Sequence, residues 1–181
     1  MLKRLSDIHN DNVIVFIDAS VLIYVHGSLI QSDSYVNYMK QNDYARTIGA
    51  LLKTERKLVT TWLSVAEVLH VHERHMYVEY KALLGQQVEF TKKDFRRIPA
   101  QRLKVQKELK RILNEMLAYY TLLSVDTNAT QVDQFVKKYT VHTYDPNDYL
   151  ALEAVISKSI SAVITDDADF YNDNKLTVYS V

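Results

Sequence analysis

The sequence predicts an α/β protein with a three-layer α/β/α architecture, in which a mostly parallel central sheet of about five strands is covered by helices on both faces. Short apolar segments alternate along the chain with longer segments of helical periodicity, and such alternation is typical of parallel sheets. The segment at residues 13–17 is apolar throughout, which is typical of a strand that is covered on both faces.

The expected elements alternate from one end of the chain to the other. The expected strands are residues 13–17, 57–61, 122–125, 161–164 and 176–181. The expected helices are residues 35–56, 64–76, 100–120, 127–139 and 147–159. The helix at residues 100–120 has the clearest amphipathic pattern, because its apolar residues recur at every third or fourth position.

Two of these helices have recognisable first turns. Ser64 and Glu67 have the spacing of a capping box, in which a serine accepts a backbone N–H and a glutamate reaches back to the cap. Asp145 precedes Pro146, so an aspartate cap is followed by the residue that suits the first helical position. We therefore expect Glu67 and Asp148 to lie in the first turns of their helices.

The composition is that of a single domain without flexible linkers. The chain has 181 residues, of which 48% are hydrophobic, with only three glycines and two prolines. Residues 1–181 are therefore expected to form one domain, with an extended helical region at about residues 70–120. The absence of cysteine excludes disulfides, thiolate zinc sites and cysteine nucleophiles. The sequence shows no secretory signal and no apolar segment near the ~20 residues that cross a bilayer, so we expect a cytoplasmic protein with no membrane partner.

Acidic residues follow the expected strands or begin the helices after them. Asp18 directly follows the strand at residues 13–17, and Asp167 comes just after the strand that ends at Ile164. Because the carboxyl ends of parallel strands share one edge of a sheet, we expect these two acids to meet Glu67 and Asp148 there. Each acid alone is explained as a cap or turn residue. Together they would repel one another, and a hard cation such as Mg²⁺ or Mn²⁺ removes that repulsion.

The order of these motifs resembles that of the PIN-domain ribonucleases, including the VapC-type toxins. Four segments carry the resemblance: residues 16–23 (FIDASVLI), 60–69 (TTWLSVAEVL), 148–154 (DYLALEA) and 163–170 (VITDDADF). The resemblance implies that the catalytic and metal-binding acids are Asp18, Glu67, Asp148 and Asp167. It also implies a more peripheral fifth ligand, Asp169, and a hydrogen bond from Ser20 to a ligand acid or a water. The adjacent Asp166 leaves the register of the fourth acid open by one residue.

The resemblance also implies a function. The expected activity is that of a metal-dependent endoribonuclease, which hydrolyses phosphodiester bonds of RNA with Mg²⁺ or Mn²⁺ as cofactor. Such an enzyme can be the toxin of a toxin–antitoxin pair. The partners that the resemblance allows are an antitoxin protein and a second copy of the chain. One alternative is a PIN-like scaffold that binds RNA or protein without cleaving. Another is a phosphotransferase with an aspartyl nucleophile, although Ser20 stands where such enzymes commonly have a second acid.

Net charge gives no signal for nucleic acid, since the chain has 22 lysines and arginines and 22 acids. Residues 91–111, however, carry a strong local excess of basic side chains. Such a stripe can follow a phosphate backbone, whereas the alternative is an ordinary solvated helix face. The residues expected to contact RNA are Ser20, Arg96, Arg97, Lys104, Lys107 and Arg111.

Overall fold

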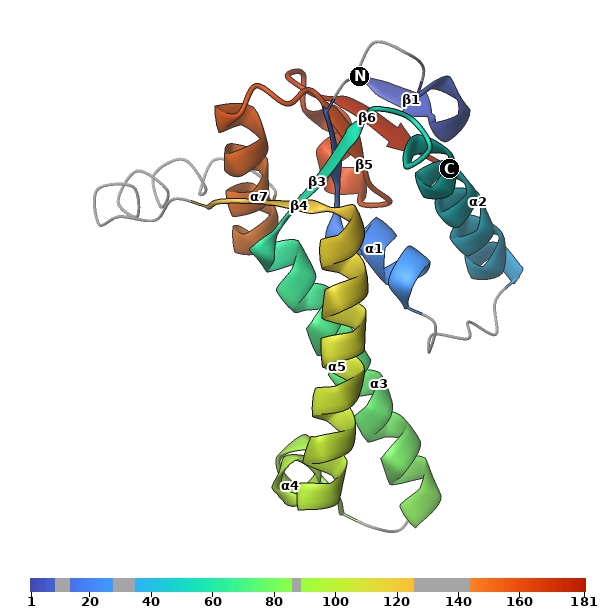
Figure 1. Cartoon of the computed structure of the whole chain (residues 1–181), viewed down its shortest axis with the longest axis vertical. Coiled ribbons are helices and arrows are strands. Elements are labelled where there is room, and N and C mark those ends of the chain that lie inside the picture. The colour runs from blue at the N-terminus through green and yellow to red at the C-terminus, as the bar shows by residue number, and fades with distance from the viewer. Residues whose placement is uncertain (9–13, 28–34, 86–88, 126–143) are drawn as a thin grey trace.

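The computed structural model of the chain describes residues 1–8, 14–27, 35–85, 89–125 and 144–181. Six parallel strands form one sheet in the order β1-β6-β5-β2-β3-β4, and helices lie on both of its sides (Figure 1). The strands are β1 (Leu2–Arg4), β2 (Ile14–Ile17), β3 (Lys57–Thr61), β4 (Thr121–Leu123), β5 (Ala162–Ile164) and β6 (Thr177–Ser180). The predicted three-layer α/β/α fold with a parallel sheet is thus confirmed.

The helices follow the strands along the chain. They are α1 (Ala19–His26), α2 (Tyr35–Leu51), α3 (Trp62–Leu84), α4 (Lys92–Arg97), α5 (Pro99–Tyr119) and α7 (Pro146–Ser157). Two short 3₁₀ helices, η1 (Leu5–Asp7) and η2 (Ala168–Asn172), follow strands β1 and β5. The helix predicted at residues 127–139 lies outside the described residues.

The two faces of the sheet carry separate apolar cores, which accounts for the uninterrupted apolar sequence of β2. Val15 and Ile17 pack on one face with residues of α1, α2, α3 and α5. Phe16 points to the other face and packs with residues of α7. All three side chains are fully buried, because successive residues of a strand point to opposite faces.

Several local predictions differ from the structure. Helix α1, which directly follows Asp18, was not predicted. Strand β1 was not predicted, because all three of its residues are exposed and one short strand of this kind has no apolar pattern. Helix α3 begins at Trp62, two residues earlier than predicted: Thr61 is the cap and accepts the backbone N–H of Ser64 at 3.2 Å. Ser64 therefore lies inside the first turn, and the predicted capping box with Glu67 is wrong. Helix α4 was also missed, since only Phe95 of its six residues is apolar.

Helices α3 and α5 form a long hairpin that extends away from the sheet, with α4 packed near its far end (Figure 1). This hairpin has a small core of its own, made by Met76, Phe95 and Val105 and surrounded by Tyr77, Tyr80, Phe90 and Leu109. Helix α4 starts with a complete capping box between Thr91 and Asp94. Core and cap together hold α4 against the hairpin. In the described part of the chain, none of the helices has both the length and the apolar character that crossing a membrane demands.

Candidate active site

Asp18 is a buried carboxylate at the carboxyl end of β2. It is the cap of α1 and only 3% exposed. Three donors share its Oδ2 atom: Ser20 Oγ at 2.8 Å, Thr165 Oγ1 at 2.8 Å and the Ser20 backbone N–H at 3.4 Å. Burial raises the pKa of Asp18, and these hydrogen bonds lower it in part. The hydroxyls thus fix the orientation of a carboxylate that has no ion-pair partner among the described residues.

The two acids after β5 have different surroundings, and this difference concerns the register that the sequence left open. Lys40 Nζ donates to both carboxylate oxygens of Asp166, at 2.9 and 2.8 Å, and Tyr44 Oη donates to the same carboxylate at 3.1 Å. Asp167 instead caps η2, where its Oδ1 accepts the backbone N–H of Asp169 at 2.9 Å. Asp166 is neutralised by a lysine, which favours Asp167 as the fourth acid.

Glu67 and Asp148 are within electrostatic range of Asp18 and Asp167. Desolvation raises the pKa of Asp148 to about 7, and the charges of Asp145, Asp18, Asp167 and Glu67 add to the rise. The pKa of Glu67 is raised by partial desolvation and then by the charges of Asp18, Asp145 and Asp167. Desolvation is the larger cause in both cases, and the added contribution from other carboxylates requires that these acids lie near one another. The sheet edge therefore collects a group of mutually repelling acids.

The described acids are near one another but do not form a complete metal-binding site. Within the described residues, no three side chains of aspartate, glutamate or histidine are placed so that they could hold one metal ion together. Mg²⁺ characteristically takes only one or two protein carboxylates, with waters and substrate phosphates as its other ligands. The donors present are hard oxygen ligands, as Mg²⁺ and Mn²⁺ prefer. The chemistry of the donor set therefore fits either ion, although a preformed three-ligand site is absent from the part of the chain described.

Asp169, the predicted fifth ligand, is exposed and differs from the other acids. Its charge, with those of Asp173 and Asp148, adds to the desolvation that raises the pKa of Tyr144. The charges that act on Glu67 and Asp148 do not include it. Its assignment as a metal ligand remains a prediction with no support from these interactions.

Sequence reasoning missed three residues of this edge. Asp145 was interpreted only as a cap; it does accept the backbone N–H groups of Asn147 and Asp148, at 2.7 and 2.9 Å, and its charge also raises the pKa of Glu67 and Asp148. Thr165 is fully buried, donates to Asp18 and accepts the Asp167 N–H at 2.9 Å. Its sequence signal is a threonine that directly follows the apolar strand β5. Lys40 has none, because it is 126 residues from Asp166 along the chain.

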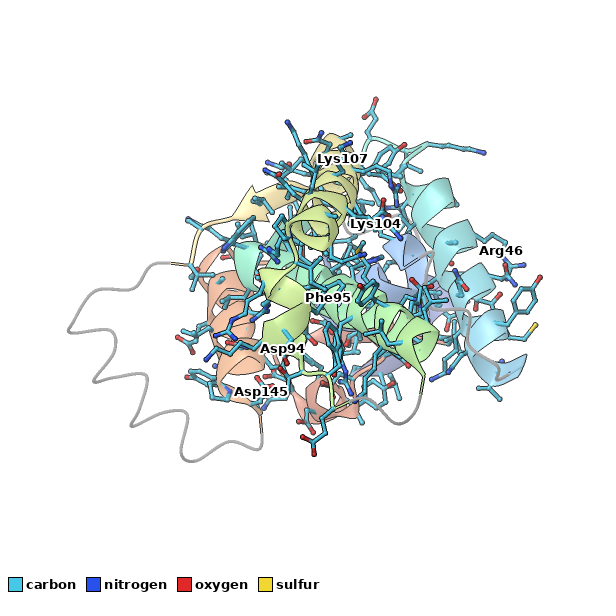
Figure 2. All side chains as sticks on the ribbon, turned by 90° about the horizontal axis from the view of Figure 1, so that it is seen from below. Arg46, Asp94, Phe95, Lys104, Lys107 and Asp145 are labelled. Carbon is cyan, nitrogen blue, oxygen red and sulfur yellow. The ribbon has the colours of Figure 1, made fainter. Side chains whose placement is uncertain are left out.

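The predicted RNA-contacting cations are divided between ion pairs and free surface. Arg96 is bound to Glu73, and Arg111 pairs with Glu108 and Glu115 at 2.7 and 3.1 Å. Arg97 has a long contact of 3.8 Å to Asp94. Lys104 and Lys107 are exposed, and Figure 2 shows both on the side of the α3–α5 hairpin that is remote from Asp145. Ser20 binds Asp18 through its hydroxyl, as the resemblance implied. Contact of any of these residues with RNA remains a prediction.

Comparison with known proteins gives a likeness of fold. No family model and no curated protein matches the sequence. The fold is similar to that of a chain in the crystal structure of VapBC2 from Rickettsia felis bound to a DNA fragment from their promoter. The similarity covers 93% of this chain and 99% of the other, with a TM-score of 0.53 and 12% sequence identity. At this identity the likeness is one of fold alone: the chain has the fold of a component of a VapBC complex.

Proposed function

We propose that this chain is a metal-dependent endoribonuclease that hydrolyses phosphodiester bonds of RNA at the acidic edge of its sheet. The observation that carries the proposal is the proximity of acids from three different segments: the charge of Asp18 adds to the rise in the pKa of both Glu67 and Asp148, and the charge of Glu67 adds to that of Asp148. A fold without a ligand there gains nothing from such repulsion. The fold similarity to a VapBC component supports the same reading.

Asp18 and Asp148 would hold the cation, with Asp167 beside them. A bound Mg²⁺ or Mn²⁺ supplies positive charge that orients a phosphodiester and lowers the pKa of a water. Glu67 is exposed to solvent and has a raised pKa. A carboxylate oxygen of Glu67 therefore takes a proton from the attacking water as the new P–O bond forms. The bond to the leaving oxygen breaks, and that oxygen receives a proton from solvent.

The proposed role is that of a toxin, and the fold similarity to a component of the VapBC2 complex supports it. In this proposal a small partner protein binds the chain and blocks the acidic edge until it is released. A second copy of the chain remains a further partner implied by the resemblance. Neither partner is needed for the chemistry at Asp18.

A scaffold that binds without cleaving is the second candidate, and it is favoured by the lack of a three-ligand metal site among the described residues. The two candidates differ in one assay. Purified chain is incubated with a fluorescent single-stranded RNA in Mg²⁺, in Mn²⁺ or in EDTA, and products are resolved on a denaturing gel. The nuclease predicts discrete cleavage in metal and none in EDTA. Intact RNA under all conditions would leave only the scaffold.

A further inference from the structure

Glu73 on α3 gathers three cations from two other helices. Its side chain is 9% exposed. Arg96 of α4 binds both of its carboxylate oxygens, with Nε at 3.0 Å from Oε1 and Nη2 close to Oε2. Arg102 of α5 donates from Nη1 to Oε1 at 2.8 Å, and Lys92 of α4 lies 3.3 Å from Oε2. One carboxylate thus faces three positive charges.

This arrangement has more charge and more donors than a structural ion pair needs. One negative charge among three cations leaves two positive charges without balance. The side chains of Arg96 and Arg102 are each 49% exposed. Within the described residues, Nε and Nη2 of Arg102 and Nη1 of Arg96 have no hydrogen-bond partner. Guanidinium groups with free donors in a fixed plane suit the geometry of a phosphate.

The cations are held in place before any ligand arrives. Phe95 of α4 is fully buried and contacts the rings of Tyr77 and Tyr80, at centroid distances of 5.9 and 5.7 Å. This packing fixes α4 against α3 and so places Lys92 and Arg96 on the side of the helix where Glu73 holds them. An open hollow of about 520 Å³ adjoins Arg102 and is lined by Pro99, Arg102, Leu103 and Gln106. Arg102 is the cation that lines this hollow, and its hydrogen bond to Glu73 holds it in place before a phosphate binds, which reduces the entropy lost on binding.

The position of the cluster relates it to the acidic edge. Glu67 and Glu73 are six residues apart on the same helix, which is about 9 Å along its axis. Figure 2 shows Asp94 of α4 on the side of the hairpin where Asp145 lies, whereas Lys104 lies on the other side. In Figure 1, α4 and α7 lie on the same side of α5. Because Glu73 is about 9 Å along α3 from Glu67, a strand with one phosphate at the acidic edge reaches the cations around Glu73 within a few nucleotides.

We propose that Lys92, Arg96 and Arg102, gathered on Glu73, form a phosphate-binding site that holds the backbone of the polynucleotide substrate beside the acidic edge. The proposal takes its substrate class from the function proposed above, and it does not depend on cleavage. It assigns backbone contact to the cations around Glu73 and none to Lys104 and Lys107. Because the site has no groups that read a base, single-stranded RNA and DNA of one sequence use it alike.

The test measures binding of a fluorescein-labelled single-stranded RNA by anisotropy in EDTA, where no cleavage occurs. Arg102→Gln is the first variant, because Arg96 and Lys92 remain to pair with Glu73 and its melting temperature reports that the fold is kept. The dissociation constant should rise about five- to tenfold, the loss expected for one charge-assisted contact. The slope of log K against log salt should fall by about 0.7. Arg102→Lys should recover most of the affinity.

Lys110→Gln is the matched control, since it removes one charge from an exposed position of the same helix, eight residues and about 12 Å along the axis from Arg102. It should bind RNA like the unmodified chain. Equal losses for both variants, or no loss for Arg102→Gln, would overturn the site. Full displacement of RNA by millimolar inorganic phosphate would overturn its assignment to a polynucleotide.

The binding assay also separates this site from the proposed function. If no metal supports cleavage and Arg102→Gln still loses affinity, the nuclease assignment fails and the phosphate site stands. If cleavage occurs in Mg²⁺ and Arg102→Gln binds and cleaves like the unmodified chain, the nuclease assignment stands and the phosphate site fails.

Discussion

Asp18→Asn should lower RNA cleavage by roughly a thousandfold, the scale of losing one central electrostatic contact in an active site. Asparagine keeps the size of the side chain and an oxygen that can accept from Ser20 and Thr165. It loses the negative charge that a cation at this edge requires. The rate of product formation in Mg²⁺ and in Mn²⁺ measures the effect.

The same variant should be more stable than the unmodified chain when no metal is present. The folded-state pKa of Asp148 is about 7, above its ordinary value of 3.8, from desolvation and from charges that include Asp18. Because folding raises this pKa, the desolvation and repulsion of the ionised carboxylate lower the stability in full above about pH 7. This loss of stability disappears as the pH falls toward 4. At pH 8 in EDTA, Asp18→Asn should therefore gain on the order of 1 kcal/mol. The gain should shrink as the pH is lowered to 5.

The control for Asp18 is Asp43→Asn on α2, where the aspartate forms a surface pair with Arg46. It makes the same chemical change away from the acidic edge and should alter neither cleavage nor the pH dependence of stability. Cleavage by Asp18→Asn at the rate of the unmodified chain would refute the assignment of Asp18.

Glu73→Gln should cost about 2 kcal/mol of unfolding free energy, which corresponds to a fall of about 4 to 8 °C in the melting temperature of a chain of this size. The three cations around Glu73 lower its pKa to about 2, with the hydrogen bonds from Arg96 as the largest cause. Glutamine leaves those cations facing one another without a counter-charge. Half-exposed arginines can turn to water, which keeps the cost below that of a fully buried pair.

The pH dependence separates this effect from a packing defect. Because folding lowers the pKa of Glu73, its ionised carboxylate stabilises the fold in full above the unfolded pKa of about 4.5. This contribution is lost as the pH falls toward 2. The difference between Glu73→Gln and the unmodified chain should therefore be constant at neutral pH and should shrink below about pH 4. Glu79→Gln on the same helix, an exposed residue that pairs with His75, is the control and should change stability by less than about 0.5 kcal/mol. A fall in stability that is as large for Glu79→Gln would contradict the account of Glu73.

The positions of the acids follow from local signals that a sequence contains. An apolar run that ends in Asp18 and a cap at Asp145 that precedes Asp148 each depend on neighbours in the chain, and the rules for strands and helix caps apply to them directly. The choice between Asp166 and Asp167 as the fourth acid does not follow from a local signal. The choice of Asp167 rests on Lys40, which pairs with Asp166 from a helix more than a hundred residues earlier, and no local pattern contains that pairing.

The basic segment was predicted as one stripe because the sequence shows charge without its partners. Glu73 pairs with Arg96, and Glu108 and Glu115 pair with Arg111. These pairs depend on how α4 and α5 pack against α3. Packing of that kind rests on the single apolar residue Phe95 in α4, which gives no helical periodicity to detect.

The central claim is that acids from separate segments share a divalent cation, and binding of Mn²⁺ at neutral pH tests it most directly. The electron paramagnetic resonance signal of free Mn²⁺ is followed while the ion is titrated into the metal-free chain. The account predicts saturable binding at millimolar concentrations or below that is weakened at least about tenfold in Asp18→Asn and Asp148→Asn, and unchanged in Asp43→Asn. An unmodified chain that binds no Mn²⁺ at millimolar concentrations, or variants that bind it equally well, would contradict the account.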